Sequence, residues 1–107
     1  MKIKKEIAET LKLISPSDLG RATGYSRQLI NMQLRSENLE ADSLIKYAKL
    51  FGCPIEALYI EAVDWAIYPV PFYEWLKDNA ADLPGKFYNA HGKLKLKPVL
   101  ELWEQNR

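Results

Sequence analysis

The sequence predicts a mainly α-helical fold, with five helices in the first part of the chain and a small C-terminal extension. Apolar residues recur at spacings of three and four, which is the period of a helix with one buried face. Residues that begin helices, Ser15-Pro16 and Ser26, alternate with Gly24 and Gly52, which end them. The 107 residues, of which 48% are hydrophobic and 27% charged, suffice for one modest core and exclude global disorder.

The first three helices are expected over residues 3–14, 16–23 and 27–35. The apolar residues of the first helix share one face: Ile3, Ile7, Leu11 and Ile14. Ser15 can cap the second helix, and Pro16 fits its first position, where a missing N–H costs nothing. Gly24 can adopt the positive φ that the turn needs, and Ser26 can cap the third helix.

Two further helices are expected to complete the first part of the chain, residues 1–67. The fourth covers about 41–51, with Leu44, Ala48 and Phe51 on one face, and ends at Gly52. The fifth is expected to start at Cys53-Pro54 and to run to residue 67 with a continuous apolar stripe. We therefore expect one domain over 1–67 and an extension over 68–107 that serves for dimerisation or contact with a partner.

The extension begins where two prolines in three residues, Pro69 and Pro71, force an extended connection. A sixth helix is expected at about 72–82 and a last helix at 99–105. Between them, residues 86–89 and 93–97 could pair as a small β-hairpin, because the second segment alternates strictly. Its lysines, Lys93, Lys95 and Lys97, could protect a strand edge from aggregation or touch DNA beside a binding site.

The third helix carries the residues that point most directly to a function. Arg27, Gln28, Asn31 and Arg35 recur at spacings of three and four, away from the apolar positions Ile30 and Leu34. Arg can bridge O6 and N7 of guanine, and Gln or Asn can bridge N6 and N7 of adenine. No acidic residue lies between Arg27 and Arg35, so nothing there would repel phosphates. This pattern favours a helix that enters the major groove of DNA.

Ser15–Tyr59 resembles the Cro/C1-type helix-turn-helix domain of phage repressors and bacterial regulators. The resemblance rests on Leu19-Gly20, Gly24-Tyr25-Ser26 and Ile30, together with Leu44–Leu58, which resembles the two closing helices of that family. With the first helix it covers about residues 3–60 and implies a five-helix, lambda-repressor-like domain. Pro16 stands where the family often has Gln, and Gly20 stands where it often has Ala.

The resemblance also implies which residues would contact DNA. The base-facing positions are Arg27, Gln28, Asn31 and Met32. The positions near phosphates are Ser26 and Arg35, to which we add Arg21; Gly24 and Tyr25 form the turn.

The expected function is that of a transcriptional regulator, a phage or bacterial repressor that binds an inverted-repeat operator as a homodimer. The aromatic residues of the second half suggest where the dimer contact could lie: Trp65, Phe72 and Trp75. The alternative is a protein-interaction module on a helix-turn-helix scaffold, such as an antitoxin or a phage assembly or packaging adaptor.

Other chemistry has little support in the sequence. Cys53 and His91 are the single residues of their types, and no Gly-rich phosphate loop exists, so we expect no enzyme, no metal and no cofactor. No apolar run approaches the roughly 20 residues that cross a bilayer, so we expect a cytoplasmic protein. The net charge of +1 conceals an acidic middle, 37–84, between two basic ends.

Overall fold

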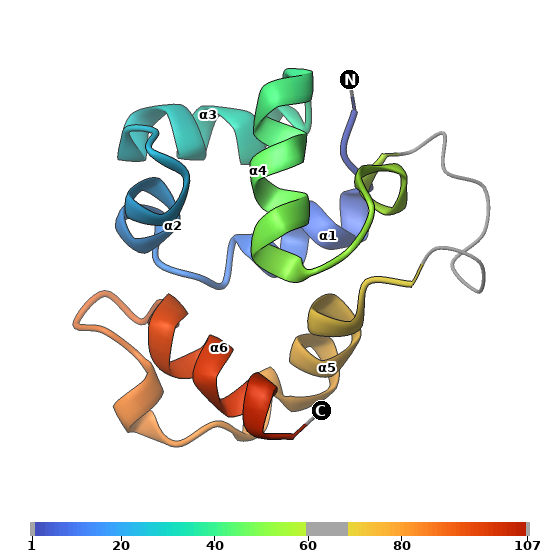
Figure 1. Cartoon of the computed structure of the whole chain (residues 1–107). Coiled ribbons are helices and arrows are strands. Elements are labelled where there is room, and N and C mark those ends of the chain that lie inside the picture. The colour runs from blue at the N-terminus through green and yellow to red at the C-terminus, as the bar shows by residue number, and fades with distance from the viewer. Residues whose placement is uncertain (1, 60–68, 107) are drawn as a thin grey trace.

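The computed structural model describes residues 2–59 and 69–106 and is mainly helical over them. The six α-helices in this part are α1 (Lys5–Leu11), α2 (Pro16–Thr23), α3 (Arg27–Ser36), α4 (Ala41–Phe51), α5 (Pro71–Asn79) and α6 (Leu96–Gln105). Three short 3-10 helices accompany them: η1 (Ile55–Leu58), η2 (Ala80–Asp82) and η3 (Gly85–Phe87). The four N-terminal helices lie together, and α5 and α6 pack beneath them (Figure 1).

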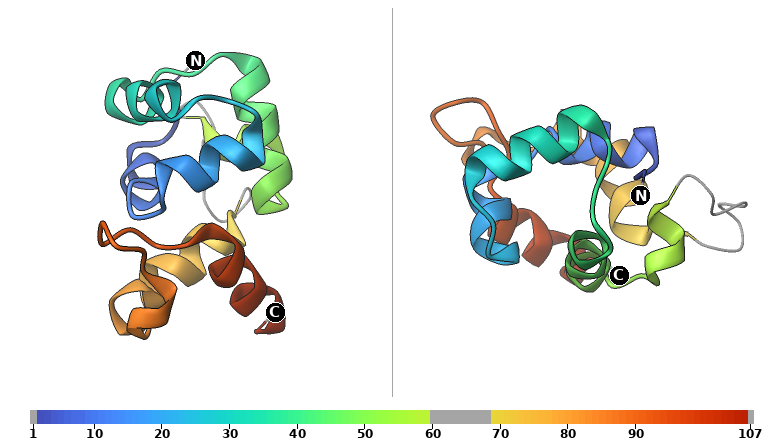
Figure 2. Two further views of the ribbon diagram at one scale, coloured as in Figure 1. Left: turned by 90° about the vertical axis from the view of Figure 1, so that its left-hand side faces the viewer. Right: turned by 90° about the horizontal axis from the view of Figure 1, so that it is seen from above.

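Both parts of the chain contribute to one hydrophobic core. α5 contacts α1 and α4, and α6 contacts α2, as the turned views also show (Figure 2). The ring of Phe72 on α5 lies with its centroid 5.4 Å from that of Phe51 on α4 and 5.1 Å from that of Trp103 on α6. The extension is thus seated on the N-terminal helices. The expected domain boundary at 67 and 68 lies outside the described residues.

The helix boundaries that depend on residues next to the helix lie where the sequence predicts them. α2 and α4 have the expected bounds, and α3 is one residue longer than expected. Gly24 and Gly52 follow α2 and α4 with φ of 83° and 66°, the left-handed conformation that glycine adopts without a steric penalty.

The first helix is shorter than predicted because its two outer apolar residues belong to other contacts. Ile3 forms a β-bridge with Tyr59, and its N–H donates to the carbonyl of Glu37 at 3.0 Å. Ile14 forms a β-bridge with Leu94. Both isoleucines are buried, so the predicted face is right, but the helix covers only Lys5–Leu11.

The fifth helix also differs from the prediction. After Pro54 the chain forms only η1, and Tyr59 is extended, with φ of −90° and ψ of 160°. Its pairing with Ile3 is incompatible with a helix that continues through this residue. The rest of the predicted fifth helix lies outside the described residues.

The extension keeps its two predicted helices but not the predicted hairpin. α5 is Pro71–Asn79, continued by η2, and α6 begins at Leu96, three residues before the expected start. No strand occurs in the described residues; Tyr88 and Leu94 form a single bridge around a turn. The N–H of Asn89 donates to the carbonyl of Lys93, and the N–H of Lys95 to that of Phe87, both at 2.8 Å. No longer ladder forms, because Phe87 belongs to η3 and Leu96 already begins α6.

Candidate nucleic-acid interface

α2 and α3 are joined by a tight turn whose geometry follows from local hydrogen bonds. The N–H of Gly24 donates to the carbonyl of Gly20 at 2.7 Å, which closes α2. The Oγ of Ser26 accepts from the N–H of Leu29 at 3.1 Å, which caps α3. The chain therefore leaves one helix and enters the next within three residues, Gly24, Tyr25 and Ser26.

Gly20 allows α2 to approach this turn closely. A Cβ atom placed at Gly20 would lie 2.5 Å from the carbonyl oxygen of Tyr25, which is a backbone atom that cannot move alone. Any residue other than glycine at this position would therefore force α2 and the turn apart.

The predicted base-facing residues share the outer face of α3. Arg27, Gln28, Asn31 and Met32 are all exposed, and the Met32 side chain is 53% exposed. Ile30 and Leu34 are buried on the opposite face, against the rest of the molecule. α3 therefore presents a continuous exposed surface of long polar side chains with one thioether among them.

The predicted phosphate contacts are also exposed, although two of them are already engaged within the chain. Ser26 caps α3 with its oxygen, which leaves its hydroxyl hydrogen free to donate. Arg21, with 74% of its side chain exposed, forms an ion pair with Asp18. Arg35 is exposed in the last turn of α3. All three residues therefore lie at the surface of the segment from α2 to α3.

A cluster of Tyr25, Asp42 and Lys46 supports the turn from α4, and the sequence did not predict it. The Tyr25 hydroxyl donates to Asp42 Oδ2 at 2.7 Å, and Lys46 Nζ lies 3.4 Å from the same oxygen. Lys46 Nζ also lies 4.2 Å from the centre of the Tyr25 ring. The hydrogen bond from Tyr25 and then the charge of Lys46 lower the pKa of Asp42. The i, i+4 spacing of Asp42 and Lys46 was the only signal in the sequence.

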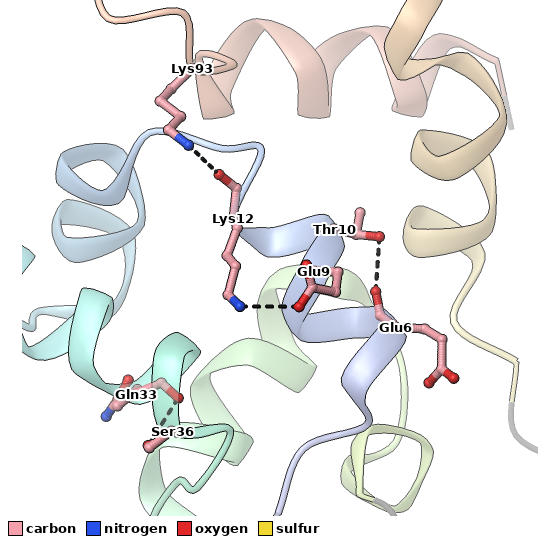
Figure 3. Close-up of polar contacts among 7 residues, drawn as sticks. All are labelled: Glu6, Glu9, Thr10, Lys12, Gln33, Ser36 and Lys93. Atoms are coloured by element: carbon pink, nitrogen blue, oxygen red, sulfur yellow. Dashed lines mark hydrogen bonds and ion pairs between the residues drawn. The ribbon is translucent and has the colours of Figure 1, made fainter.

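A second contact between α3 and α4 lies deeper. Gln33 Nε2 donates to Ser43 Oγ at 3.0 Å, and both side chains are buried. The C-terminal end of α3 is held nearby, where the Ser36 hydroxyl donates to the carbonyl of Gln33 at 3.3 Å (Figure 3). The bond between Gln33 and Ser43 joins α3 to α4 and so restricts the rotation of α3 about its axis.

The residues proposed for a dimer contact occupy three different situations. Phe72 is 2% exposed inside the core, so its ring is not available to a second copy, and the prediction fails for this residue. Trp75 is half-buried, with its ring centroid 6.3 Å from that of Phe72. Trp65 lies outside the described residues.

Other candidate groups are placed as follows. Burial raises the pKa of the Cys53 thiol to about 11, so it stays protonated at neutral pH. His91 is exposed in the turn between η3 and α6. Among residues 2–59 and 69–106, no three His, Cys, Asp or Glu side chains are grouped as metal ligands would be. Over the same residues, no helix is both long and apolar enough to cross a membrane.

Comparison with known proteins finds no matching family, no matching curated protein and no matching solved structure. The geometry of α2, the turn and α3 is therefore the basis for a functional proposal.

Proposed function

We propose that α2, the turn at Gly24 and α3 form a helix-turn-helix that binds double-stranded DNA, with α3 in the major groove. The observation that carries this proposal is the outer face of α3, which is exposed, polar and free of acidic residues from Arg27 to Ser36. A groove-reading helix needs long polar side chains outside, apolar ones inside and a rigid support. The contacts of α3 with α2 and α4 supply that support.

Within this proposal each exposed side chain has a chemical role. Arg27 reads guanine, Gln28 and Asn31 read adenine, and Met32 offers an apolar contact to a thymine methyl group. Ser26, Arg35 and Arg21 bind phosphates and fix the position of the helix on the duplex.

The biological role that we propose is transcriptional regulation by a phage or bacterial repressor. One short helix reads few base pairs, so a homodimer on an inverted repeat, with half-sites about 34 Å apart, would supply the missing specificity. Such a repressor acts by occupying a promoter.

The binding site is tested by substitution of Arg27. A duplex selected from a random library, or taken from upstream of the gene, is titrated with the wild-type protein, Arg27→Ala and the control Lys77→Ala. We expect Arg27→Ala to weaken specific binding by about 1–3 kcal/mol and to relax the base preference, because the arginine reads a base edge. Lys77 lies on α5, so Lys77→Ala should bind as the wild type does.

The outcomes of this titration are distinct. Equal loss on selected and unrelated DNA would make Arg27 a phosphate contact. A folded wild-type protein that binds no duplex at low salt would contradict the proposal. Sedimentation of the same mixtures gives the stoichiometry, and one protein per inverted repeat would contradict the homodimer.

One observation favours the alternative function, a protein-interaction module such as an antitoxin or a phage assembly or packaging adaptor. A surface groove with a volume of about 1130 Å³ lies between α2 and α6, and Ala22, Leu50 and Leu100 line it. The substitution Leu100→Glu should abolish the binding of a partner protein in this groove, whereas DNA binding through α3 should be unchanged.

A further inference from the structure

A second basic segment, far from α3 in the sequence, lies beside the N-terminal end of α2. From Leu83 to Leu100 the chain carries no acidic residue, and its four charged side chains are Lys86, Lys93, Lys95 and Lys97. Leu19–Ser36, which includes most of α2 and all of α3, is likewise free of acidic residues and carries three arginines. The chain thus contains two basic segments of similar composition.

Main-chain hydrogen bonds join the lysine segment, Leu83–Leu100, to the residues just before α2. The N–H of Leu94 donates to the carbonyl of Leu13 at 2.7 Å, and the N–H of Ser15 donates to the carbonyl of Leu94 at 2.8 Å. Lys93 Nζ adds a bond of 3.0 Å to the carbonyl of Lys12 (Figure 3). Since Ser15 caps α2, the lysine segment is fixed at the position where α2 begins.

Asp18, an acidic residue in the first turn of α2, is already engaged. Asp18 Oδ2 accepts from the N–H of Leu96 at 3.0 Å, and its other oxygen pairs with Arg21. Two further exposed acids, Glu101 and Glu104, follow on α6 and line the same groove as Arg21, Lys95 and Lys97. At the start of α6 itself, Lys95 and Lys97 are exposed, and Arg21 is exposed on α2.

The lysine segment and α3 lie on the same side of the molecule. The loop between η3 and α6 and the turn between α2 and α3 share the left-hand side of Figure 1. With that side toward the viewer, the loop lies just below α2, and α3 lies above it (Figure 2, left). α2 therefore lies between α3 and the loop that carries the lysines (Figure 2, left).

We propose that Lys95 and Lys97, together with Arg21, bind the phosphate backbone of the duplex beside the base pairs that α3 reads. The inference rests on the proposed function, because it needs a duplex seated on α3. In this arrangement the C-terminal extension is part of the DNA-binding surface, and it lengthens the contacted duplex without reading its sequence. Exposed lysines suit this role, because a flexible ammonium group binds phosphate as a point charge.

The test is the salt dependence of binding. Each phosphate contact contributes about 0.9 to the slope of log K against log salt. Lys95→Gln/Lys97→Gln should therefore reduce the slope by about 2 and weaken binding to selected and unrelated duplexes alike. The charge-matched control, Lys5→Gln/Lys77→Gln, changes exposed lysines on α1 and α5 and should keep the wild-type slope.

A shortened duplex adds a second readout. When the base pairs outside the α3 site are removed, the wild type should lose slope and the Lys95→Gln/Lys97→Gln variant should match it. An unchanged slope for this variant, in a protein that binds DNA through Arg27 and keeps its thermal transition, would overturn the inference alone. A wild type that binds no duplex would overturn the proposed function and the inference together.

Discussion

At the scale of the residue, Gly20 and the Tyr25 carbonyl decide how closely α2 and the turn pack. A Cβ at Gly20 would lie 2.5 Å from that oxygen, a distance that real Cβ atoms do not show. Glycine is therefore required here, although it costs about 1 kcal/mol relative to alanine in a helix interior. The position of the turn, and with it the start of α3, depends on this residue.

Gly20→Ala should lower the free energy of unfolding by about 1–3 kcal/mol, because the clash with the turn outweighs the gain in helix propensity. The control is Gly85→Ala, since a Cβ there meets nothing within 4 Å. Urea unfolding followed by circular dichroism measures both variants. A Gly20→Ala protein as stable as the wild type would show that α2 and the turn are further apart than described.

Single residues also mark the limit of what the sequence could predict about the site. The outward positions of Arg27, Gln28, Asn31 and Met32 followed from helical spacing, which is a local property. The bond from Tyr25 to Asp42 joins residues 17 positions apart, and no spacing rule connects them. The burial of Phe72 likewise depends on α6, which packs its Trp103 against the ring.

At the scale of the element, the helix ends divide into local and non-local ones. Ser15, Pro16 and Gly24 lie next to the helix that they bound, and α2 was predicted at its observed limits. α1 is bounded on its two sides by Ile3 and Ile14, which form bridges with Tyr59 and Leu94. η1 ends at Leu58, directly before Tyr59 pairs with Ile3. α6 begins at Leu96 because a carboxylate on α2 accepts its N–H, and Lys95 before it makes no side-chain cap.

Asp18→Ala should therefore loosen α6 from α2. Loss of a capping carboxylate costs about 0.5–2 kcal/mol, and the effect should lie in the unfolding free energy and in faster amide exchange at the start of α6. Asp78→Ala, which removes an exposed carboxylate from α5, is the matched control. Unchanged exchange at Leu96 in the Asp18→Ala protein would contradict the assignment of this cap.

At the scale of the whole molecule, the extension covers the N-terminal helices from beneath and leaves α3 uncovered (Figure 1). The mainly helical class was predictable from the sequence, because the spacing of apolar residues shows that a helix has a buried face, whichever element packs against that face. How α5 and α6 pack against the N-terminal helices could not be predicted from the sequence. This packing depends on aromatic rings such as those of Phe51 and Phe72, which are distant in the sequence and come together only in the folded protein. The proposed DNA binding depends on this uncovered surface of α3.

The most direct test of DNA binding by α3 is to map the amide resonances of the isotope-labelled protein as a selected duplex is added. If α3 enters the major groove, the largest shifts should fall on Ser26–Arg35, with smaller ones at Arg21 and at Lys95 and Lys97. The amides of α5 should stay unchanged. Shifts confined to the groove between α2 and α6, or no shifts at saturating duplex, would contradict the claim that α3 reads DNA.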